Sequence, residues 1–297
     1  MKPDPRFLNL PRPFWANVRT IGQAVGYTVR GEGRIRVPSI DEIRQEYSKI
    51  GLSSSHLADG RTGELRPLGK TLLDYFNYRA RVLDEFVEPR LMDASRAKTV
   101  FRTLRSRLHP GCPIPMNKQK GKKKAPAYFT SIINMLVEAH SQGIPVDYDP
   151  RELTTVTSDN APLRTLSRRI DGAFPCAVNP LAVWEIKEYY YTTTFGSRVA
   201  DGVYETLLDG MELAELADAE GIKVKHYLMI DAHYTWWDCG KSYLCRILDM
   251  LHMGYVDEVL VGYEVVERLP DIVGEWVKLA SQPSRSQLTV KRHRSPS

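Results

Sequence analysis

The alternation of apolar and polar residues predicts a chain that begins with helices and continues with strands and helices in turn. Apolar residues recur at spacings of three and four over 70–90, 127–140 and 198–219, and each pattern predicts an amphipathic helix. Shorter helices are predicted over 242–253 and 271–279. These segments supply the apolar faces from which a core can be built.

Short apolar or β-branched runs between the helices indicate strands. Such runs occur at 153–157, 226–231 and 258–261, and a strand pair is predicted within 168–191. From residue 127 onward the order is helix, three strands, helix, strand, helix. The sequence therefore predicts an α/β fold in which helices flank a mixed central sheet.

The first part of the chain is different in character. Residues 1–40 are rich in Pro, Gly and Arg without a clear period, so an irregular arm is predicted there. A short helix over 40–50 follows the capping residue Ser39, and a strongly basic helix is predicted over 96–108. This region is therefore expected to be mainly helical.

Charge divides the chain more clearly than hydropathy does. Residues 1–125 contain 25 Lys and Arg and 12 Asp and Glu, a net charge of +13, whereas residues 126–297 contain 16 and 24, a net charge of −8. We expect a basic helical region at 1–125, an α/β core at 126–285 and a basic disordered tail at 286–297. The asymmetry favours a polyanionic partner for the first region, and the alternative is that both regions merely have solvated charged surfaces.

Several classes of protein are excluded by composition. No apolar run approaches the ~18 residues of a membrane span, and the N-terminus lacks the apolar segment of a signal peptide. The four cysteines, at 112, 176, 239 and 245, do not have metal-site spacing. A cytoplasmic protein with reduced thiols is therefore expected.

The candidate chemistry lies in one stretch, where Asp171 precedes Glu185-Ile186-Lys187. Side chains alternate along a strand, so Glu185 and Lys187 share one face while Trp184 and Ile186 share the apolar face. Two carboxylates and an amine in this arrangement suit a divalent metal site that cleaves phosphodiesters.

Hairpin geometry predicts that Asp171 lies opposite Glu185. The centre of such a pairing is residue 178, inside the turn-like segment 175–180. Opposed side chains have Cβ atoms roughly 5 Å apart, so two carboxylates at this distance need a cation or a proton. The alternative is a plain strand with an exposed Glu/Lys pair and an Asp beside a turn.

The order helix, three-strand meander, helix, strand, with Asp on the second strand and Glu-x-Lys on the third, resembles the PD-(D/E)XK nuclease superfamily. The chain is most similar to the type II restriction endonucleases, over about residues 127–235. The resemblance implies that Asp171 and Glu185 bind Mg²⁺, for which Mn²⁺ substitutes, and that Lys187 orients the attacking water or helps to deprotonate it. It also implies a further acid on the helix before the meander, where Glu138 is the matching position. The backbone carbonyl of Ile186 is a further expected metal ligand. The residue before Asp171 is Ile170 and not the proline of the motif.

A restriction enzyme implies double-stranded DNA as substrate, a homodimer that matches a palindromic site, and a cognate DNA methyltransferase that protects the same sequence. Two basic groups are the predicted DNA contacts, unless they are ordinary solvated surface: Arg102 and Arg105, and the run Lys118, Lys120, Lys122, Lys123 and Lys124. Alternative functions are a repair, mobile-element or other defence nuclease of the same fold, or a non-catalytic DNA-binding protein with a degenerate nuclease core.

Overall fold

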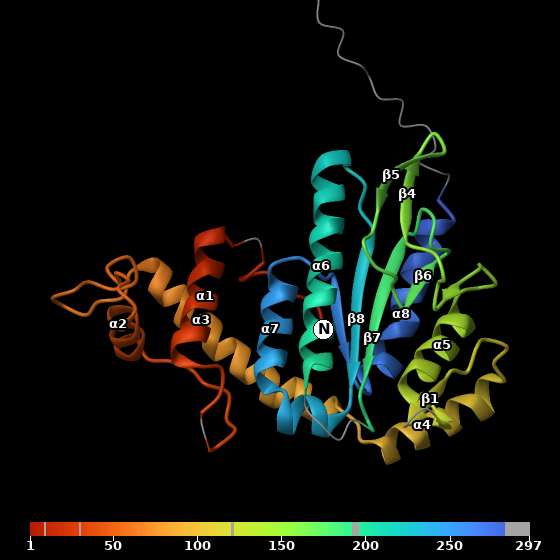
Figure 1. The fold of residues 1–297 in the computed structure, drawn as a ribbon, viewed down its shortest axis with the longest axis horizontal. Coiled ribbons are helices and arrows are strands. Elements are labelled where there is room, and N and C mark those ends of the chain that lie inside the picture. Colours follow the sequence, from red (N-terminus) through yellow and green to blue (C-terminus); the bar gives the residue numbers. More distant parts are fainter. Residues whose placement is uncertain (9, 30, 120–121, 192–195, 283–297) are drawn as a thin grey trace, which may run out of the picture.

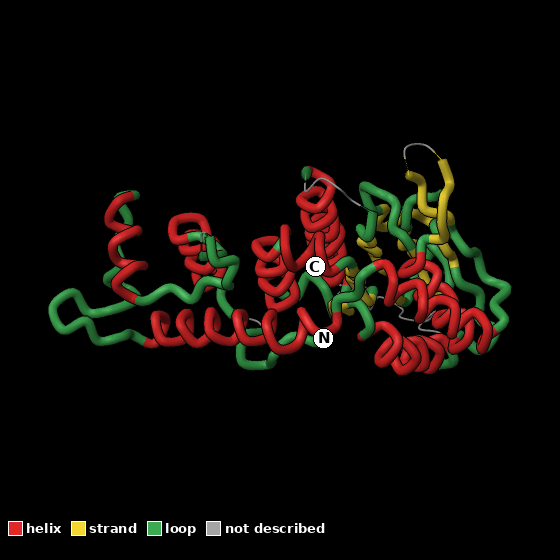
Figure 2. The backbone as a smooth tube through the Cα atoms, turned by 90° about the horizontal axis from the view of Figure 1, so that it is seen from below, coloured by secondary structure: helices red, strands yellow, loops and turns green. Residues whose placement is uncertain are grey.

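The computed structural model of the 297-residue chain describes residues 1–8, 10–29, 31–119, 122–191 and 196–282. In this part of the chain a five-stranded sheet carries helices on both faces, and further helices extend from one side of it (Figure 1). A view turned by 90° shows the described strands toward one end of the molecule and the N-terminal helices at the other (Figure 2). The predicted class, an α/β fold with a mixed central sheet flanked by helices, is confirmed.

The central sheet combines an antiparallel and a parallel half. Its strands, in spatial order, are β3 (Asp147–Tyr148), β6 (Gly172–Phe174), β7 (Ala182–Glu188), β8 (Lys225–Asp231) and β9 (Glu258–Val261). The first three strands pair antiparallel, and β7, β8 and β9 pair parallel. The strand β7 is central and joins the two halves.

Two small antiparallel hairpins lie outside the central sheet. One is formed by β1 (Met116–Gln119) and β2 (Lys122–Pro126), and the other by β4 (Thr155–Ser158) and β5 (Ala161–Thr165). The second hairpin ends just before the segment that leads into β6, so it connects β3 to the candidate site.

Helices cover both faces of the sheet. On one face lie α5 (Tyr128–His140) and α8 (Glu264–Ala280), with α4 (Ala94–Leu108) packed against α5 in the same hydrophobic core. On the other face lie α6 (Ser197–Glu220) and α7 (Lys241–His252), which follows the π-helical turn η3 (Tyr234–Cys239). The site is framed by β6, β7 and α6.

The N-terminal helices form a smaller core of their own, built on aromatic residues such as Phe14, Tyr47 and Phe76. They are α1 (Arg12–Val25), α2 (Ile40–Lys49) and α3 (Pro67–Val82), which continues through the turns η1 (Leu83–Val87) and η2 (Glu88–Arg90). As predicted, Ser39 caps α2, and its side chain accepts a hydrogen bond from the backbone N–H of Glu42.

The expectation of an irregular arm over residues 1–40 is wrong for α1. Prolines at its start suggested loop, but proline is favoured in the first turn of a helix, where its missing N–H has no partner to lose. The buried residues Phe14, Val18 and Ile21 then recur at helical spacing.

Two other segments differ from their predictions. The helix predicted over 271–279 begins at Glu264 and contains Pro270, because Leu269, Val273 and other buried side chains hold the helix against the core. The lysine run, for which no strand was predicted, forms strands β1 and β2 on either side of residues 120–121, which lie outside the described part.

None of the helices in the described residues is long and apolar enough to cross a membrane.

Gly172 allows β6 to approach β7 beside the candidate site. A Cβ at this position would lie 2.1 Å from Cε2 of Trp184, whose ring is fully buried and stacked on Trp276. We therefore expect Gly172→Ala to destabilise the protein by about 1–3 kcal/mol, the usual cost of overpacking a core. Urea unfolding measures this.

The matched control is Gly274→Ala, in helix α8, where an added Cβ meets no atom within 4 Å. Alanine is favoured over glycine in a helix by about 1 kcal/mol, so this variant should be neutral or stabilised. Equal stability of the two variants would contradict the close packing at Gly172.

Candidate active site

The register of β6 and β7 places the two predicted carboxylates across from each other. Gly172 pairs with Trp184 and Ala173 with Val183, so Asp171 lies opposite Glu185 in continuation of the same register. The backbone N–H of Asp171 donates to the carbonyl of Trp184 at 3.2 Å, which extends the ladder to this residue. The predicted hairpin register is confirmed.

The alternation of side chains along β7 also follows the prediction. Ala182 and Trp184 pack into the core formed with α5 and α8, whereas Val183 packs with residues of α6. Glu185 and Lys187 therefore point toward α6. Both are buried, since Glu185 is 0% exposed and Lys187 9% exposed. Charged residues are rarely this buried unless they are paired.

Lys187 and Glu185 form a buried ion pair, with Nζ donating to Oε2 at 2.7 Å. Burial works against the charged forms, yet Glu185 and Asp171 hold the pKa of Lys187 above its ordinary value. The pKa of Glu185, also opposed by burial, is held below its ordinary value by Lys187 and by Arg168. The lysine is thus fixed as a cation and the glutamate as an anion at neutral pH.

Of the two opposed carboxylates, Asp171 is the one that takes up a proton more readily. Its Oδ2 accepts a hydrogen bond from the backbone N–H of Ile186 at 2.7 Å, which aims the carboxylate toward β7. Burial, and then the negative charge of Glu185, raise the pKa of Asp171 to about 6. The predicted repulsion between two opposed carboxylates is therefore present, and a proton or a cation relieves it.

Helix α6 brings two more acids that sequence reasoning missed. Glu205 accepts from Nζ of Lys187 at 3.3 Å, and Asp209, one turn later, is completely buried. Burial and the charge of Glu185 raise the pKa of Asp209 to about 7. The sequence did contain an indication of Asp209, because this acid falls on the apolar face of the predicted helix. Gly202 allows this approach, since a Cβ there would lie 3.1 Å from Cδ of Lys187.

Arg168 was also missed, and it bridges these acids. Its Nη1 lies 2.6 Å from Oδ2 of Asp209 and 3.0 Å from Oε1 of Glu185. Its Nη2 lies 3.2 Å from Oε2 of Glu205. The guanidinium thus neutralises part of the negative charge of the site, as Lys187 does.

Further polar contacts hold the segment that carries Arg168 against α6. Arg164 pairs with Glu215 at 2.9 Å, and the backbone N–H of Ser167 donates to Glu212 at 3.1 Å. The site nevertheless reaches solvent, because the side chain of Glu205 is 43% exposed and that of Arg168 is 23% exposed. A ligand can therefore approach from this end.

Glu138 does not join the site, contrary to the expectation that it completes the metal ligands. It lies on α5, which covers the opposite face of the sheet from α6. Its Oε2 accepts from the backbone N–H of Gly111 at 3.1 Å, next to the buried thiol of Cys112. The sequence correctly placed Glu138 on a helix before the strands, but it could not show which face of the sheet this helix covers.

The predicted DNA contacts on α4 lie on the other side of the sheet from these acids. Arg102 and Arg105 are exposed on α4, as predicted for a basic face. Lys118, Lys122, Lys123 and Lys124 belong by their backbone to β1 and β2, but their side chains lie outside the described part, as does the whole of Lys120.

The fit of a metal ion can be judged from the carboxylate oxygens. In the described residues no group of three or more His, Cys, Asp and Glu side chains is arranged to hold a metal, since Arg168 and Lys187 lie between the acids. However, Oδ1 of Asp209 is buried without a hydrogen-bond partner, and Oε1 of Glu185 has only the ion pair with Arg168. Buried unpaired carboxylate oxygens are costly, and a hard cation satisfies them. The opposed carboxylates of Asp171 and Glu185 also supply the oxygen ligands that a divalent cation prefers, so this pair fits such an ion.

Comparisons with known proteins give two family matches. A family model described as a domain of unknown function (DUF7687) matches residues 92–276, and a second, also described as a domain of unknown function (DUF7690), matches residues 1–86. No curated protein matches the chain. No solved structure matches it either.

Proposed function

We propose that this chain, which belongs to the DUF7687 family, is a Mg²⁺-dependent endonuclease that hydrolyses phosphodiester bonds of double-stranded DNA. The observation that carries the proposal is the convergence of Asp171, Glu185 and Lys187. The succession α5, β3, β6, β7, α6, β8, interrupted only by the separate hairpin of β4 and β5, also supports the resemblance to the PD-(D/E)XK nucleases.

Asp171 and Glu185, together with the backbone carbonyl of Ile186, are the residues that would hold the ion. When bound, Mg²⁺ would supply Lewis-acid polarisation of the scissile phosphate and acidify a water molecule. The carboxylates fix the position of the reacting groups because they come from opposed positions on two adjacent strands of the sheet.

Lys187 contributes a fixed positive charge to the reaction. Its ammonium group donates to Glu185 and Glu205, and one of its three protons remains for a water or a phosphoryl oxygen. Because its pKa is held above the ordinary value, it serves as a hydrogen-bond donor to an attacking water and to the developing negative charge, not as a general base in this state.

Within this class of nuclease, we propose a cytoplasmic type II restriction enzyme that acts as a homodimer on a sequence protected by a cognate methyltransferase. The test is incubation of the purified protein with plasmid and phage DNA, with Mg²⁺ or with EDTA. Discrete fragments that vanish when the DNA carries the cognate methylation support restriction. Cleavage without sequence preference or methylation sensitivity supports a repair, mobile-element or other defence nuclease.

A non-catalytic DNA-binding protein is the second candidate. The observation that favours it is the pairing of the acids with Arg168 and Lys187, which neutralises part of the charge of the site without a metal ion. Sequence-specific binding without cleavage in either Mg²⁺ or Mn²⁺ would support this function and reject the nuclease.

Arg168 is expected to compete with a divalent cation for the carboxylates. Replacing it with alanine removes a guanidinium that lies within 3.3 Å of oxygens of Glu185, Glu205 and Asp209. We expect Arg168→Ala to bind Mn²⁺ about tenfold more tightly, which corresponds to about 1.4 kcal/mol. Isothermal titration calorimetry measures the affinity directly, without reference to cleavage.

The same variant should be less stable than the wild-type protein in EDTA, by about 1.5–3 kcal/mol, because buried carboxylates lose a charged hydrogen-bond donor. Arg164→Ala is the matched control, since Arg164 lies on the same segment and pairs with the exposed Glu215. Weaker Mn²⁺ binding by Arg168→Ala would show that the arginine supports the metal site and does not compete with it.

A further inference from the structure

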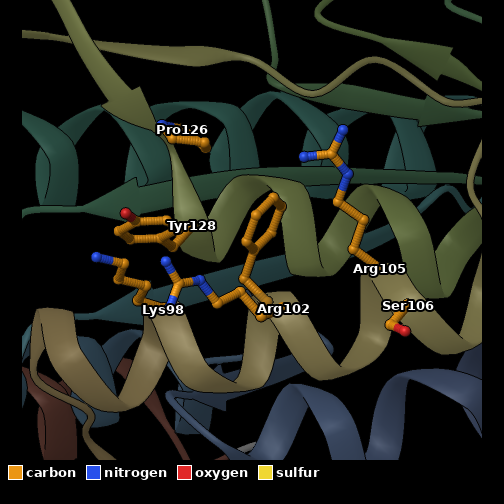
Figure 3. A pocket seen from close by; sticks show the side chains of 7 residues that line it. Lys98, Arg102, Arg105, Ser106, Pro126 and Tyr128 are labelled. Atoms are coloured by element: carbon orange, nitrogen blue, oxygen red, sulfur yellow. The ribbon is translucent and has the colours of Figure 1, made fainter.

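A cavity of about 520 Å³ lies between α4 and the start of α5, in the layer that covers the face of the sheet opposite α6 (Figure 3). The side chains of Lys98, Arg102 and Arg105 line it from α4, and Pro126 and Tyr128 line it from the other side. This cavity is therefore distinct from the acidic site between β7 and α6.

Three cations of one helix line this cavity. Lys98, Arg102 and Arg105 are spaced by four and three residues, so they share one face of α4. None of the three makes an ion pair or a hydrogen bond with another described residue that would neutralise it, whereas Arg79, Arg164 and Arg168 all pair with acids. Like charges on one helix face repel each other, and a bound anion would relieve this repulsion.

The stretch of sequence around these cations contains no acid. Between Asp93 and Glu138 the sequence contains ten Lys and Arg residues and not one Asp or Glu. The strand β2 ends at Pro126, on the wall of the cavity, so the lysine-rich hairpin adjoins it directly. Within this stretch of sequence the positive charges have no acid to compensate them, which favours an anionic ligand.

The floor of the cavity is rigid and apolar. The rings of Phe101 and Tyr128 are 4% and 6% exposed, and their centroids lie 5.5 Å apart. The guanidinium of Arg105 lies 5.9 Å from the Phe101 centroid, which restrains it over the ring. Low-dielectric walls strengthen the attraction between the cations and an anion.

Tyr128 lies at the start of α5, and this end of the helix is bound to β7, the strand that carries Glu185 and Lys187. The backbone N–H and the hydroxyl of Thr130, in the first turn of α5, donate to Oε2 of Glu188 at 3.0 and 3.1 Å. Glu188 is the last residue of β7. The cavity wall is therefore built on the sheet and not on a loop.

We propose that this cavity binds a phosphate group of a nucleic-acid strand, at a site separate from the proposed cleavage site; the choice of nucleic acid rests on the proposed function. Arginine, lysine and the hydroxyl of Ser106, which also lines the cavity, are common phosphate donors. The volume exceeds that of a phosphate alone and accommodates the attached sugar. Three cations match a terminal phosphate, whose charge near pH 7 is close to −2, better than an internal phosphodiester with one charge.

The experiment measures binding in EDTA, where no cleavage occurs. A fluorescent 20-base-pair duplex is prepared with 5′-phosphate, with 3′-phosphate or with hydroxyl termini, and fluorescence anisotropy gives the Kd of each for the full-length protein. The double variant Arg102→Ala/Arg105→Ala is compared with Arg107→Ala, which removes an exposed arginine of α4 that does not line the cavity. Circular dichroism verifies the fold of both variants.

We expect the wild-type protein and Arg107→Ala to bind one phosphorylated end about tenfold more tightly than the hydroxyl end, and the double variant to lose this preference. An equal loss of affinity for all three duplexes in the double variant alone supports an internal phosphate as the occupant. Unchanged Kd values in the double variant overturn the proposal. Because cleavage in Mg²⁺ is measured separately, a wild-type protein that does not cut but shows the phosphate preference rejects the nuclease and retains the cavity.

Discussion

Asp171→Ala and Lys187→Ala are each expected to lose Mg²⁺-dependent DNA cleavage by about a thousandfold or more, the cost of several kcal/mol of transition-state stabilisation. Asp171 is one of the two opposed carboxylates, and without it Glu185 alone cannot hold a hard cation firmly. Lys187 donates to the other carboxylate, that of Glu185, at 2.7 Å. Cleavage of supercoiled plasmid, followed over time on agarose gels, measures the loss.

A loss of cleavage reports on the site only if the variants remain folded. Lys187→Ala leaves the buried Glu185 with Arg168 as its remaining cation, so its thermal unfolding must be measured alongside activity. Asp171→Asn is the more conservative test, because an amide oxygen can still accept the hydrogen bond from the N–H of Ile186.

Matched controls remove the same groups elsewhere. Asp218→Ala removes an exposed carboxylate from the end of α6, and Lys223→Ala removes an exposed lysine that pairs with Asp257 near β8. Both should cleave at the wild-type rate. If folded Asp171→Asn or Lys187→Ala also cuts DNA at the wild-type rate with Mg²⁺, the assignment of these residues is wrong.

Asp249→Ala is expected to destabilise the protein by about 3–5 kcal/mol, because it leaves a buried arginine without its counter-ion. Nη1 of Arg79, on α3, lies 3.0 Å from Oδ1 of Asp249 on α7, and Arg79 is 1% exposed. The hydroxyl of Tyr75 also donates to this oxygen, at 2.6 Å. Urea unfolding followed by circular dichroism and tryptophan fluorescence measures the change.

This interaction joins the N-terminal helices to the α/β part, so its loss should also separate their unfolding. We expect the two probes to give one coincident transition for the wild-type protein and two transitions for Asp249→Ala. The surface control is Asp41→Ala, whose carboxylate is 87% exposed and lies 3.9 Å from Arg44, for which a change of about 0–1 kcal/mol is expected.

A double variant separates the ion pair from the packing around it. Arg79→Met/Asp249→Leu replaces both charges with apolar groups, and this often costs less than breaking a buried pair. We therefore expect the double variant to be more stable than Asp249→Ala. A loss of less than about 1 kcal/mol in Asp249→Ala would mean that the arginine finds water or another acceptor in the variant.

Local patterns in the sequence determined the hairpin that carries the two predicted carboxylates. The Pro-containing turn at 175–180 fixed the centre of the pairing, and a period of two then assigned each residue of β7 to a face, so Asp171 and Glu185 were placed opposite each other correctly. Likewise the capping of α2 by Ser39 follows from residues three positions apart. Such features depend on short-range geometry, which the order of residues encodes directly.

The tertiary structure alone decided which distant groups complete the site. Arg168, Glu205 and Asp209 meet Glu185 because α6 runs back over β7, whereas Glu138 points away because α5 packs on the other face. Periodicity shows that one face of a helix is buried, but not which partner covers it. That choice depends on how the helices pack on the sheet, and it placed two cations among the acids and three more around a cavity on the far side.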